Sequence, residues 1–366
     1  MTQLLLGRLP LAPQLRTSLL VALPLLLIVN GTLYLAYSLL QEQQRANWVI
    51  QMESGLDAAL ITMEGIRNDL HGDLLLLAGS PNLKAVLDDA AAPRLDRLAA
   101  EWEVFAGIKR QYDQIRWLDN RGMERLRINL TSHGAVRVAD EQLQDKSGRY
   151  YFKDAITMPV GQVYASRIDL NIEHGEVERP FKPMLRMAVS VSNSLGEVKG
   201  LVLVNVLADN IFKDLAQHAG LAQSHILMID PTGYYLRGFT EEREWGFMFQ
   251  LRDDRGYRFD KRYPAVWREM VRQGVGKIDA PEGLFLFRTL SYGTEGFGHR
   301  YFLLAVELPR ELSGLLADQR LMWLSISLLV SVILTLLSLF LAHYVICCGK
   351  NIDRVSGETP KHKRSG

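Results

Sequence analysis

Two long apolar stretches, residues 17–40 and 321–346, enclose about 280 residues of mixed composition. Neither stretch contains an Asp, Glu, Lys or Arg. A helix rises 1.5 Å per residue and needs about 20 apolar residues to cross a bilayer. Both stretches are long enough, so the sequence predicts two transmembrane helices with the folded part of the chain between them.

Cations near the ends of the two stretches predict the orientation. Arg8 and Arg16 precede the first stretch, and five basic residues follow the second: Lys350, Arg354, Lys361, Lys363 and Arg364. Lys and Arg favour the cytoplasmic side, so we expect both termini in the cytoplasm and residues 41–320 outside it. A cleaved signal peptide is the alternative, but its apolar region has about 7–15 residues, and residues 41–44, Gln-Glu-Gln-Gln, offer no small-residue cleavage site.

Composition limits what the exported part can be. Of 42 Lys and Arg, 35 lie between the spans, against 39 of the 41 Asp and Glu. A mildly acidic domain excludes a nucleic-acid surface, which needs clustered excess cation. The only cysteines, Cys347 and Cys348, follow the second span, so a hydrophobic core and not disulfides must stabilise the exported part. We interpret this adjacent pair as inert, with lipidation as the alternative.

An apolar stripe predicts that the first span continues outward as one long helix, residues 41–80. The stripe recurs at intervals of three and four through Trp48, Met52, Leu56, Ala59, Met63, Ile66, Leu70, Leu74 and Leu77. Pro81 should end the helix, because it disfavours helical backbone at Ser80. The same spacing suits a helix that faces a core and one that faces its copy in a dimer, so both remain open.

The rest of the exported part predicts two antiparallel sheets. After a helix at residues 91–112, strands at 114–118, 124–130, 161–170, 183–191 and 199–206 predict a five-stranded sheet, and residues 119–122, Asp-Asn-Arg-Gly, close its first hairpin. A helix at 209–219 and strands at 225–229, 234–238, 284–290 and 301–307 predict a second, smaller sheet. Residues 231–233, Pro-Thr-Gly, repeat the turn chemistry of the first, so the halves resemble variants of one plan. A helix at 309–320 leads into the second span.

Aromatic and basic residues predict a small-molecule pocket. Arg149, Tyr150 and Tyr151 lie in a Gly-containing segment between strands, where side chains can converge over a sheet face. Four arginines lie inside predicted strands, where a buried guanidinium would need an anionic partner: Arg116, Arg127, Arg167 and Arg186. Such a pocket suits a small organic anion or a zwitterion, with Asp169 available for an ammonium. Alternatively, these arginines point outward or pair with nearby carboxylates.

One run of residues carries a resemblance to a known family. It comprises residues 115–119 (Ile-Arg-Trp-Leu-Asp), 143–152 (Leu-Gln-Asp-Lys-Ser-Gly-Arg-Tyr-Tyr-Phe), 163–171 (Val-Tyr-Ala-Ser-Arg-Ile-Asp-Leu-Asn) and 183–186 (Pro-Met-Leu-Arg). This run and the layout of residues 41–320 resemble the double Cache sensory domains of bacterial chemoreceptors, histidine kinases and diguanylate cyclases.

The resemblance implies an α+β fold: two transmembrane helices flanking a double Cache (tandem PAS-like) extracytoplasmic domain with a long N-terminal helix and two antiparallel sheets. It implies a membrane-distal module at about 81–208, a membrane-proximal module at about 209–308, and a homodimer in the bacterial inner membrane. It places Arg149, Tyr151 and Asp169 at the lid and sheet of the family's pocket, and Lys146 and Tyr164 lie in the matched run. Amino-acid-binding members carry Arg, one intervening residue and Trp-Tyr; here Tyr150-Tyr151 follows Arg149 directly, so the ligand stays unnamed.

We therefore expect a membrane-anchored sensor of a small organic ligand and not an enzyme. The sequence shows no zinc-protease HExxH, no GxSxG elbow and no histidine spacing for a metal, so we expect no cofactor, metal or catalytic residue. The tail at residues 347–366 is too short for a catalytic domain, and its residues 350–366 resemble a disordered segment. Two alternatives remain: the truncated input half of a diguanylate cyclase or histidine kinase, and an envelope scaffold. A sensor of this kind would signal through a separate cytoplasmic protein.

Overall fold

The computed structural model describes residues 13–173, 175–218, 226–249, 255–292, 299–307 and 309–356. It divides into a helical unit, Met1–Val49 with Pro309–Gly366, and a sheet unit, Ile50–Leu308. Four of the basic residues used to predict orientation, Arg8, Lys361, Lys363 and Arg364, lie outside the described residues.

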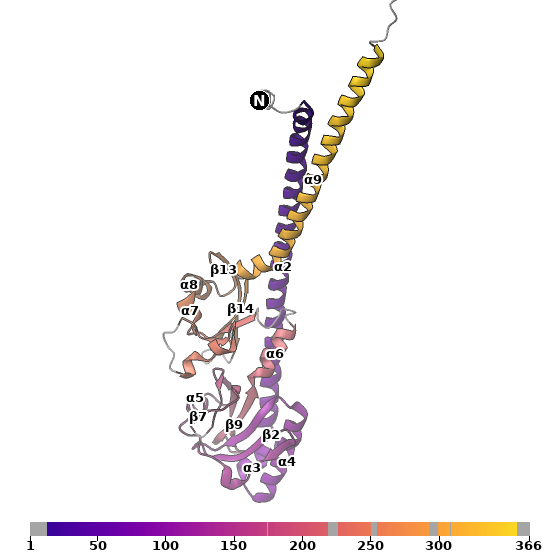
Figure 1. The fold of residues 1–366 in the computed structure, drawn as a ribbon. Coiled ribbons are helices and arrows are strands. Elements are labelled where there is room, and N and C mark those ends of the chain that lie inside the picture. Colours follow the sequence, from indigo (N-terminus) through magenta and orange to yellow (C-terminus); the bar gives the residue numbers. More distant parts are fainter. Residues whose placement is uncertain are drawn as a thin grey trace, which may run out of the picture. The chain divides into compact units, whose positions relative to one another are not determined.

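The helical unit contains both predicted spans. Helix α2 (Pro13–Ala78) begins in this unit and continues into the sheet unit, and α9 (Pro309–Ser356) contains the second apolar stretch (Figure 1). The windows apolar enough to cross a membrane lie within Ser18–Ala78 and Arg320–Val345. Their side chains face outward, as Leu27 and Leu328 do at 68% exposure each, which fits two transmembrane helices in contact with lipid. Helix α9 ends at Ser356, so the prediction of disorder from Lys350 onward is wrong for Lys350 to Ser356.

Hydroxyl and amide groups connect α2 to α9 within the helical unit. Asn30 donates from Nδ2 to Ser331 Oγ at 3.1 Å and accepts from the hydroxyl of Ser327. The hydroxyls of Ser18 and Ser338 lie 2.8 Å apart. The hydroxyls of Ser331, Thr335 and Ser338 also donate to carbonyls of α9 itself, at 2.7, 2.7 and 2.9 Å. The two helices are therefore joined by polar groups at two levels, about three turns apart along α2.

Two antiparallel sheets form the sheet unit, as the sequence predicted. The seven-stranded sheet has the order β3 (Gly134–Arg137), β2 (Glu124–Thr131), β1 (Tyr112–Leu118), β9 (Val198–Leu207), β8 (Pro183–Ser192) and β4 (Val163–Ala165), with β5 (Asp169–Leu170) also paired to β8. The five-stranded sheet has the order β11 (Tyr235–Arg237), β10 (Ile226–Ile229), β14 (His299–Glu307), β13 (Gly283–Tyr292) and β12 (Gly276–Ala280). A small ribbon, β6 (Ile172–Glu173) with β7 (Glu176–Val177), adjoins the first.

The strand predictions need correction at several places. Strands β3, β6, β7 and β12 were not predicted, and the single strand expected at 161–170 is two short strands, β4 and β5. The break falls at Ser166 to Ile168, where Arg186 donates its backbone N–H to Ser166 Oγ and Ile168 donates its own to Tyr301 Oη at 2.9 Å. Side chains thus replace the regular ladder at the break.

Helices cover both faces of the seven-stranded sheet. Helix α4 (Ala92–Lys109) packs against β1, β2 and β3 on one face, and α5 (Tyr150–Ile156) packs against β4, β8 and β9 on the other (Figure 1). Helix α4 ends three residues earlier than predicted, because Arg110 adopts a left-handed backbone with φ 52°. Helix α3 (Pro81–Asp88) was not predicted; the hydroxyl of Ser80 caps its first amides.

The predicted apolar stripe of the long helix α2 is buried within the chain. Seven stripe residues in the sheet unit are at most 2% exposed: Met52, Leu56, Ala59, Met63, Leu70, Leu74 and Leu77. Burial of such side chains stabilises the fold by about 1.5–3 kcal/mol each for the larger ones. The stripe therefore belongs to the core of one chain, and a dimer would have to use other surface of α2.

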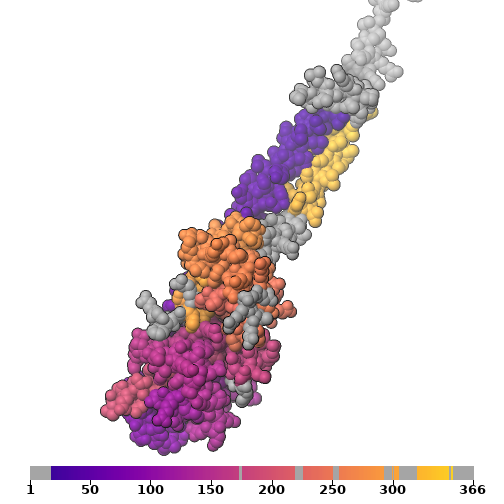
Figure 2. Space-filling model, turned by 90° about the vertical axis from the view of Figure 1, so that its left-hand side faces the viewer, coloured from indigo at the N-terminus to yellow at the C-terminus, as the bar shows by residue number. Residues whose placement is uncertain are grey.

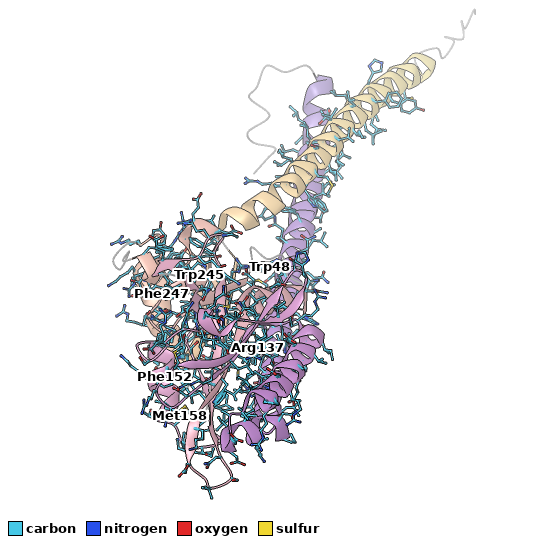
Figure 3. The ribbon with its side chains drawn as sticks, turned by 90° about the horizontal axis from the view of Figure 1, so that it is seen from below. Trp48, Arg137, Phe152, Met158, Trp245 and Phe247 are labelled. Atoms are coloured by element: carbon cyan, nitrogen blue, oxygen red, sulfur yellow. The ribbon has the colours of Figure 1, made fainter. Side chains whose placement is uncertain are left out.

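The five-stranded sheet has a second core. Residues of α7 (Phe259–Arg262) and α8 (Pro264–Gln273) pack with β13 and β14 in an aromatic cluster whose members include Phe259, Tyr263, Phe285, Phe287 and Phe302. Helix α6 (Ala208–His218) and the short helices η3 (Glu241–Arg243) and η4 (Gly246–Phe249) complete this part of the chain. In Figure 2 the residues of the two sheets appear as neighbouring magenta and orange masses, and Figure 3 labels Phe152 on α5 and Phe247 on η4.

The predicted repetition of one turn in both sheets is confirmed in detail. Asp119 Oδ1 accepts from the amides of Arg121 and Met123, and Asp230 Oδ1 accepts from those of Thr232 and Tyr234. Each turn ends in a glycine of positive φ, Gly122 at 90° and Gly233 at 92°. The carbonyl of each glycine then accepts from a later segment, at Lys146 and at Phe259. The two sheets are therefore variants of one plan.

Replacing Gly200 with Ala should destabilise the sheet unit strongly. Gly200 has φ 132°, and a Cβ there would lie 1.9 Å from the carbonyl oxygen of Leu118. We expect a loss of at least about 2 kcal/mol in the free energy of unfolding, because backbone strain alone costs about 1–3 kcal/mol and a clash adds to it. Urea unfolding of the full chain in detergent measures this loss. The control is Gly107→Ala in α4, where a Cβ meets nothing within 4 Å and should stabilise by about 0.5–1 kcal/mol; equal effects would contradict the argument.

Candidate sensory site on the seven-stranded sheet

The face of the seven-stranded sheet under α5 is half apolar and half polar. Strand register places Arg116 of β1 opposite Arg127 of β2, and Arg186 of β8 opposite Asn205 of β9. Near α5 the face is apolar, and Tyr151, Phe152 and Ala155 pack there against Leu118, Ala188, Leu201 and Leu203. Farther along, the same face carries buried charge. A sheet face with this composition can enclose a polar ligand.

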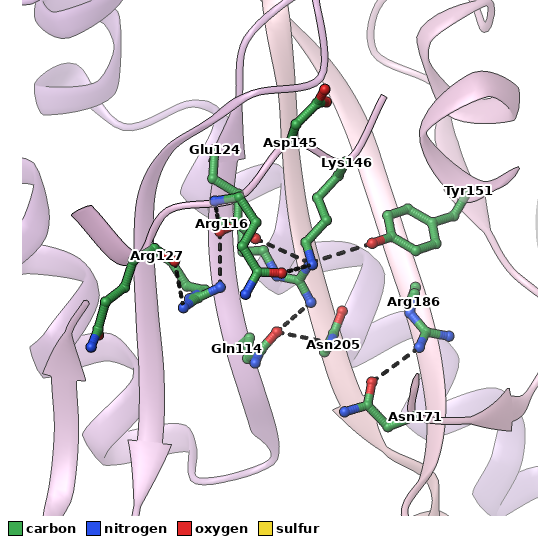
Figure 4. A network of polar contacts seen from close by, with 12 residues as sticks. Gln114, Arg116, Glu124, Arg127, Asp145, Lys146, Tyr151, Asn171, Arg186 and Asn205 are labelled. Carbon is green, nitrogen blue, oxygen red and sulfur yellow. Dashed lines mark hydrogen bonds and ion pairs between the residues drawn. The ribbon is translucent and has the colours of Figure 1, made fainter. Parts of the chain in front are cut away.

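A buried carboxylate joins two of the arginines. Glu124 is 1% exposed and accepts from Arg116 Nη1 at 3.4 Å and from Arg127 Nη1 at 2.9 Å (Figure 4). Its Oε2 also accepts the amide of Gln144 at 3.1 Å. Arg116 donates further to Gln114 and, at 3.5 Å, to Tyr151 Oη. The sequence-based expectation that strand arginines on the covered face need an anionic partner is met by Glu124.

A second ion pair lies on the neighbouring strands. Arg186 is 2% exposed and donates through Nη1 to Asp169 Oδ1 and through Nη2 to Asn171 Oδ1 at 3.3 Å. Tyr150 Oη donates to Asp169 Oδ2 at 2.7 Å. Burial and the negative charge of Asp169 raise the pKa of Tyr150 to about 12, so this hydroxyl stays a donor at neutral pH. Both oxygens of Asp169 are thus engaged within the chain, and a ligand ammonium at Asp169 would compete with Arg186.

Tyr151 lies among several cations. The guanidinium carbons of Arg186 and Arg149 lie 5.2 and 5.7 Å from the centre of its ring. Burial alone would raise the pKa of Tyr151, but the positive charges of Arg116, Arg186 and Lys146 outweigh it and lower that pKa. A lowered phenol pKa reports a positive local potential. The space around the Tyr151 hydroxyl therefore favours negative charge.

Several buried polar atoms on this face have no hydrogen-bond partner in the described part of the chain. They are Arg116 Nε, Arg127 Nε, Asn129 Oδ1 and Asn205 Oδ1. Three buried arginines, Arg116, Arg127 and Arg186, lie against two buried carboxylates, Glu124 and Asp169, which leaves one positive charge in excess among them. Buried donors and uncompensated charge are costly unless they are satisfied.

The nine predicted site residues lie on strands of this sheet, in α5 or in the segment before α5, with different roles. Arg116, Arg127, Asp169 and Arg186 are on strands, Lys146 and Arg149 precede α5, and Tyr150 and Tyr151 begin it. Tyr164 instead packs in the apolar half and directs its hydroxyl to Asp154 at 3.2 Å. Arg167 lies in the break between β4 and β5, over the rings of Tyr150 and Phe247 at 5.6 and 5.1 Å.

Sequence reasoning missed five polar residues of this face: Gln114, Glu124, Asn129, Asn171 and Asn205. Gln114 lies two residues before Arg116 and hence on the same face of β1. Asn205 is the register partner of Arg186, which becomes visible only once β8 and β9 are paired. The two-residue spacing from Arg116 could have indicated Gln114, whereas Asn205 can be assigned to this face only when the pairing of the strands is known.

A family model supplies the decisive comparison. The model for the bacterial histidine kinase sensor domain matches residues 62–301, which is more than half of the chain. The chain belongs to this family. The match covers the sheet unit that carries the site described above. The matched proteins are sensor domains and not catalytic domains, so the chain is a signal-transduction input domain with two flanking apolar helices, as in membrane-anchored sensors.

Solved structures agree with the fold of a Cache-type sensor domain. The extracellular domain of the histidine kinase designated vpHK1S-Z8 is similar with a TM-score of 0.61 and 24% identity, over 73% of this chain and 95% of that one. A domain of a sensory box/GGDEF family protein from Vibrio parahaemolyticus is similar with a TM-score of 0.61 and 25% identity, over 72% of this chain and 99% of that one. The comparison with curated proteins gives no match.

Glu124→Gln should destabilise the sensor domain severely. The change leaves Arg116 and Arg127 without a buried counter-charge, and breaking a buried ion pair costs about 3–5 kcal/mol. Urea unfolding of the full chain in detergent gives the change in the free energy of unfolding. The matched control is Arg125→Gln, which breaks the exposed pair with Asp119 and should cost at most about 1 kcal/mol. A loss below about 1 kcal/mol for Glu124→Gln would contradict the buried-pair account.

Proposed function

We propose that this sensor domain detects a small organic anion on the polar half of the seven-stranded sheet, under α5. The observation that carries the proposal is a buried face on which three arginines share two carboxylates and the Nε atoms of Arg116 and Arg127 have no partner among the described residues. Guanidinium groups bind carboxylates through paired hydrogen bonds, which gives both affinity and orientation. The aromatic rings of Tyr150 and Tyr151 would enclose the apolar part of such a ligand.

An anion suits this face better than an amino acid. A zwitterion needs an anionic group for its ammonium, and both oxygens of Asp169 already accept hydrogen bonds from Arg186 and Tyr150. The other carboxylate, Glu124, is shared by two arginines. An incoming ammonium would have to displace one of these cations, whereas an incoming carboxylate meets unused donors.

The coupling to the membrane would run through the chain itself. Strand β14 of the five-stranded sheet ends at Glu307 and α9 begins at Pro309, so one residue separates the sheet from the helix that contains the second span. A ligand can shift this helix only by as much as it binds one arrangement better than the other, typically about 1–3 kcal/mol. We propose that the signal passes through α9 to a separate cytoplasmic protein, and that the sensor works as a homodimer.

The dimer would use surface that the core leaves free. On α2, Ile61 and Leu76 are 70% and 65% exposed and lie outside the buried stripe.

Small carboxylates should stabilise the protein against heat. At 100 times its dissociation constant, a bound ligand adds about 2.7 kcal/mol to the free energy of unfolding. The measurement is thermal unfolding of the full chain in detergent with a panel of mono- and dicarboxylates, phosphate, amino acids and amines. Arg149→Gln, at the start of α5 beside Tyr151, should weaken binding of a stabilising anion at least about tenfold, since a hydrogen bond to a charged group contributes about 1.5–3 kcal/mol.

Arg121→Gln is the matched control for that experiment. Arg121 is an exposed arginine in the turn before β2, so its loss changes the net charge equally without touching the site. Stabilisation by amines alone, or an anion that binds Arg149→Gln as tightly as the wild type, would refute the proposed anion site.

We further propose that both termini are cytoplasmic and that the sensor domain lies outside the membrane. Leu195 is 80% exposed on the turn between β8 and β9, while the native cysteines Cys347 and Cys348 follow the second apolar stretch. A membrane-impermeant maleimide should label Leu195→Cys on intact spheroplasts and leave the native pair unlabelled until the membrane is opened. Labelling of the native pair before Leu195→Cys would contradict this proposal and indicate the opposite topology.

A further inference from the structure

Two adjoining cavities lie beside the five-stranded sheet, away from the anion site. Their volumes are about 240 and 540 Å³, and both are lined by Lys213 of α6, Arg237 of β11, Glu241 of η3 and Glu244. The floor of the smaller cavity is apolar, with Phe212, Leu215, Ile226, Met228 and Leu303. The larger one has the aromatic rings of Phe181 and Trp245 in its wall. Together they form an apolar recess bordered by charged side chains, which we call the rim.

The charges of this rim have the opposite balance to those of the anion site. Four carboxylates line the two cavities, Asp209, Glu241, Glu242 and Glu244, against the two cations Lys213 and Arg237. Arg237 lies between Glu244 at 3.4 Å and Asp209 at 3.6 Å and stacks on the ring of Phe212 at 5.1 Å. One guanidinium at these long distances does not neutralise the rim, so a net negative charge faces the cavities.

Glu244 is the buried acid of this rim. It is 6% exposed, and its Oε1 accepts the amide of Gly238 at 3.1 Å. Burial raises the pKa of Glu244 to about 7, and the Gly238 amide and Arg237 offset this only in part. The next residue, Trp245, is buried with a left-handed backbone of φ 63°, which is rare for a bulky side chain (Figure 3). The fold therefore holds a carboxylate in an environment where an added cation would be favoured.

We propose that these cavities form a second ligand site of the sensor domain, which takes a small organic cation: an ammonium group attached to an aromatic or branched apolar body. The ammonium would lie at Glu241 and would compete with Arg237 for Glu244, whose oxygens accept from the Gly238 amide and from Arg237. The apolar body would fill the recess lined by Phe212 and Met228. Aromatic rings such as Trp245 and Phe181 attract a cation and repel an anion. This site shares no residue with the proposed anion site, although Pro183 at the start of β8 lines the larger cavity.

Binding of 2-phenylethylamine to the full chain in detergent tests the proposal by isothermal titration calorimetry. Phenylacetate and 2-phenylethanol are the matched probes, since they keep the ring and replace the cation by an anion or a neutral group. We expect the amine to bind at least tenfold more tightly than either. Glu244→Gln keeps the volume of the side chain and should weaken the amine at least tenfold, while Glu282→Gln, on an exposed turn, should leave it unchanged.

The affinity for the amine should also rise between pH 6 and pH 8. A carboxyl with a pKa of about 7 is ionised about tenfold more at pH 8 than at pH 6, so the affinity should change by up to about tenfold. The charged groups that line the cavities with Glu244 are Arg237 on β11, Asp209 and Lys213 on α6, and Glu241 and Glu242 on η3. In Glu244→Gln the pH dependence should disappear.

Two results would overturn the cation site. The first is phenylacetate or phenylethanol that binds as tightly as the amine. The second is an amine affinity that Glu244→Gln does not change. If that variant fails to fold, Glu241→Gln on the exposed rim replaces it, and we expect this variant to bind the amine at least threefold more weakly. Weakening of the amine by Arg149→Gln would instead place it at the seven-stranded sheet. A failure of the anion-binding experiment alone would refute the proposed anion site and would not contradict the cation site.

Discussion

Burial of guanidinium groups is the constraint on which the sensory face depends. Arg116, Arg127 and Arg186 are each at most 9% exposed, and a buried cation costs several kcal/mol unless anions and hydrogen-bond acceptors surround it. The chain supplies two carboxylates, Glu124 and Asp169, for these three guanidiniums, and the Nε atoms of Arg116 and Arg127 have no partner among the described residues. Despite the cost of burying these guanidinium groups, the fold keeps a positive electrostatic potential under α5. An anionic ligand would complete the network of hydrogen bonds and ion pairs on this face.

The register of the central strands decides how these charges meet. Because side chains alternate along a strand, Gln114 and Arg116 share one face of β1, while Ile115 and Trp117 face the core that α2 and α4 cover. A shift of one residue would exchange the two faces. Gly200, which lies against the Leu118 carbonyl, can accept no side chain, so the pairing of β9 with β1 at this point depends on a glycine.

Much of this architecture could be read from the sequence, and the misses have physical causes. The α2 stripe and the repeated Asp-to-Gly turns are local signals, and both are confirmed. Helix α3 escaped prediction although Ser80-Pro81 is a cap followed by a first-turn proline, and β12 is half-exposed with a charged residue at every second position, so it lacks an apolar run. Glu124 and Asn205 could not be assigned to the site from the sequence. Glu124 meets Arg116, and Asn205 meets Gln114 and Arg186, only through strand pairing.

The contacts between α2 and α9 allow reversible movement between these helices. The amide of Asn30 connects to Ser327 and Ser331, which are one helical turn apart, and Thr335 and Ser338 continue the row of hydroxyls toward Ser18. Ser331, Thr335 and Ser338 also donate to carbonyls of their own helix, so Ser331 keeps a hydrogen bond when Asn30 releases it. Lipid offers no replacement partner to the amide, and bonds between membrane helices contribute only about 0.6 kcal/mol on average. Sliding of one helix along the other would therefore proceed in discrete steps of low free-energy cost, in which the Asn30 amide exchanges one serine hydroxyl of α9 for the next.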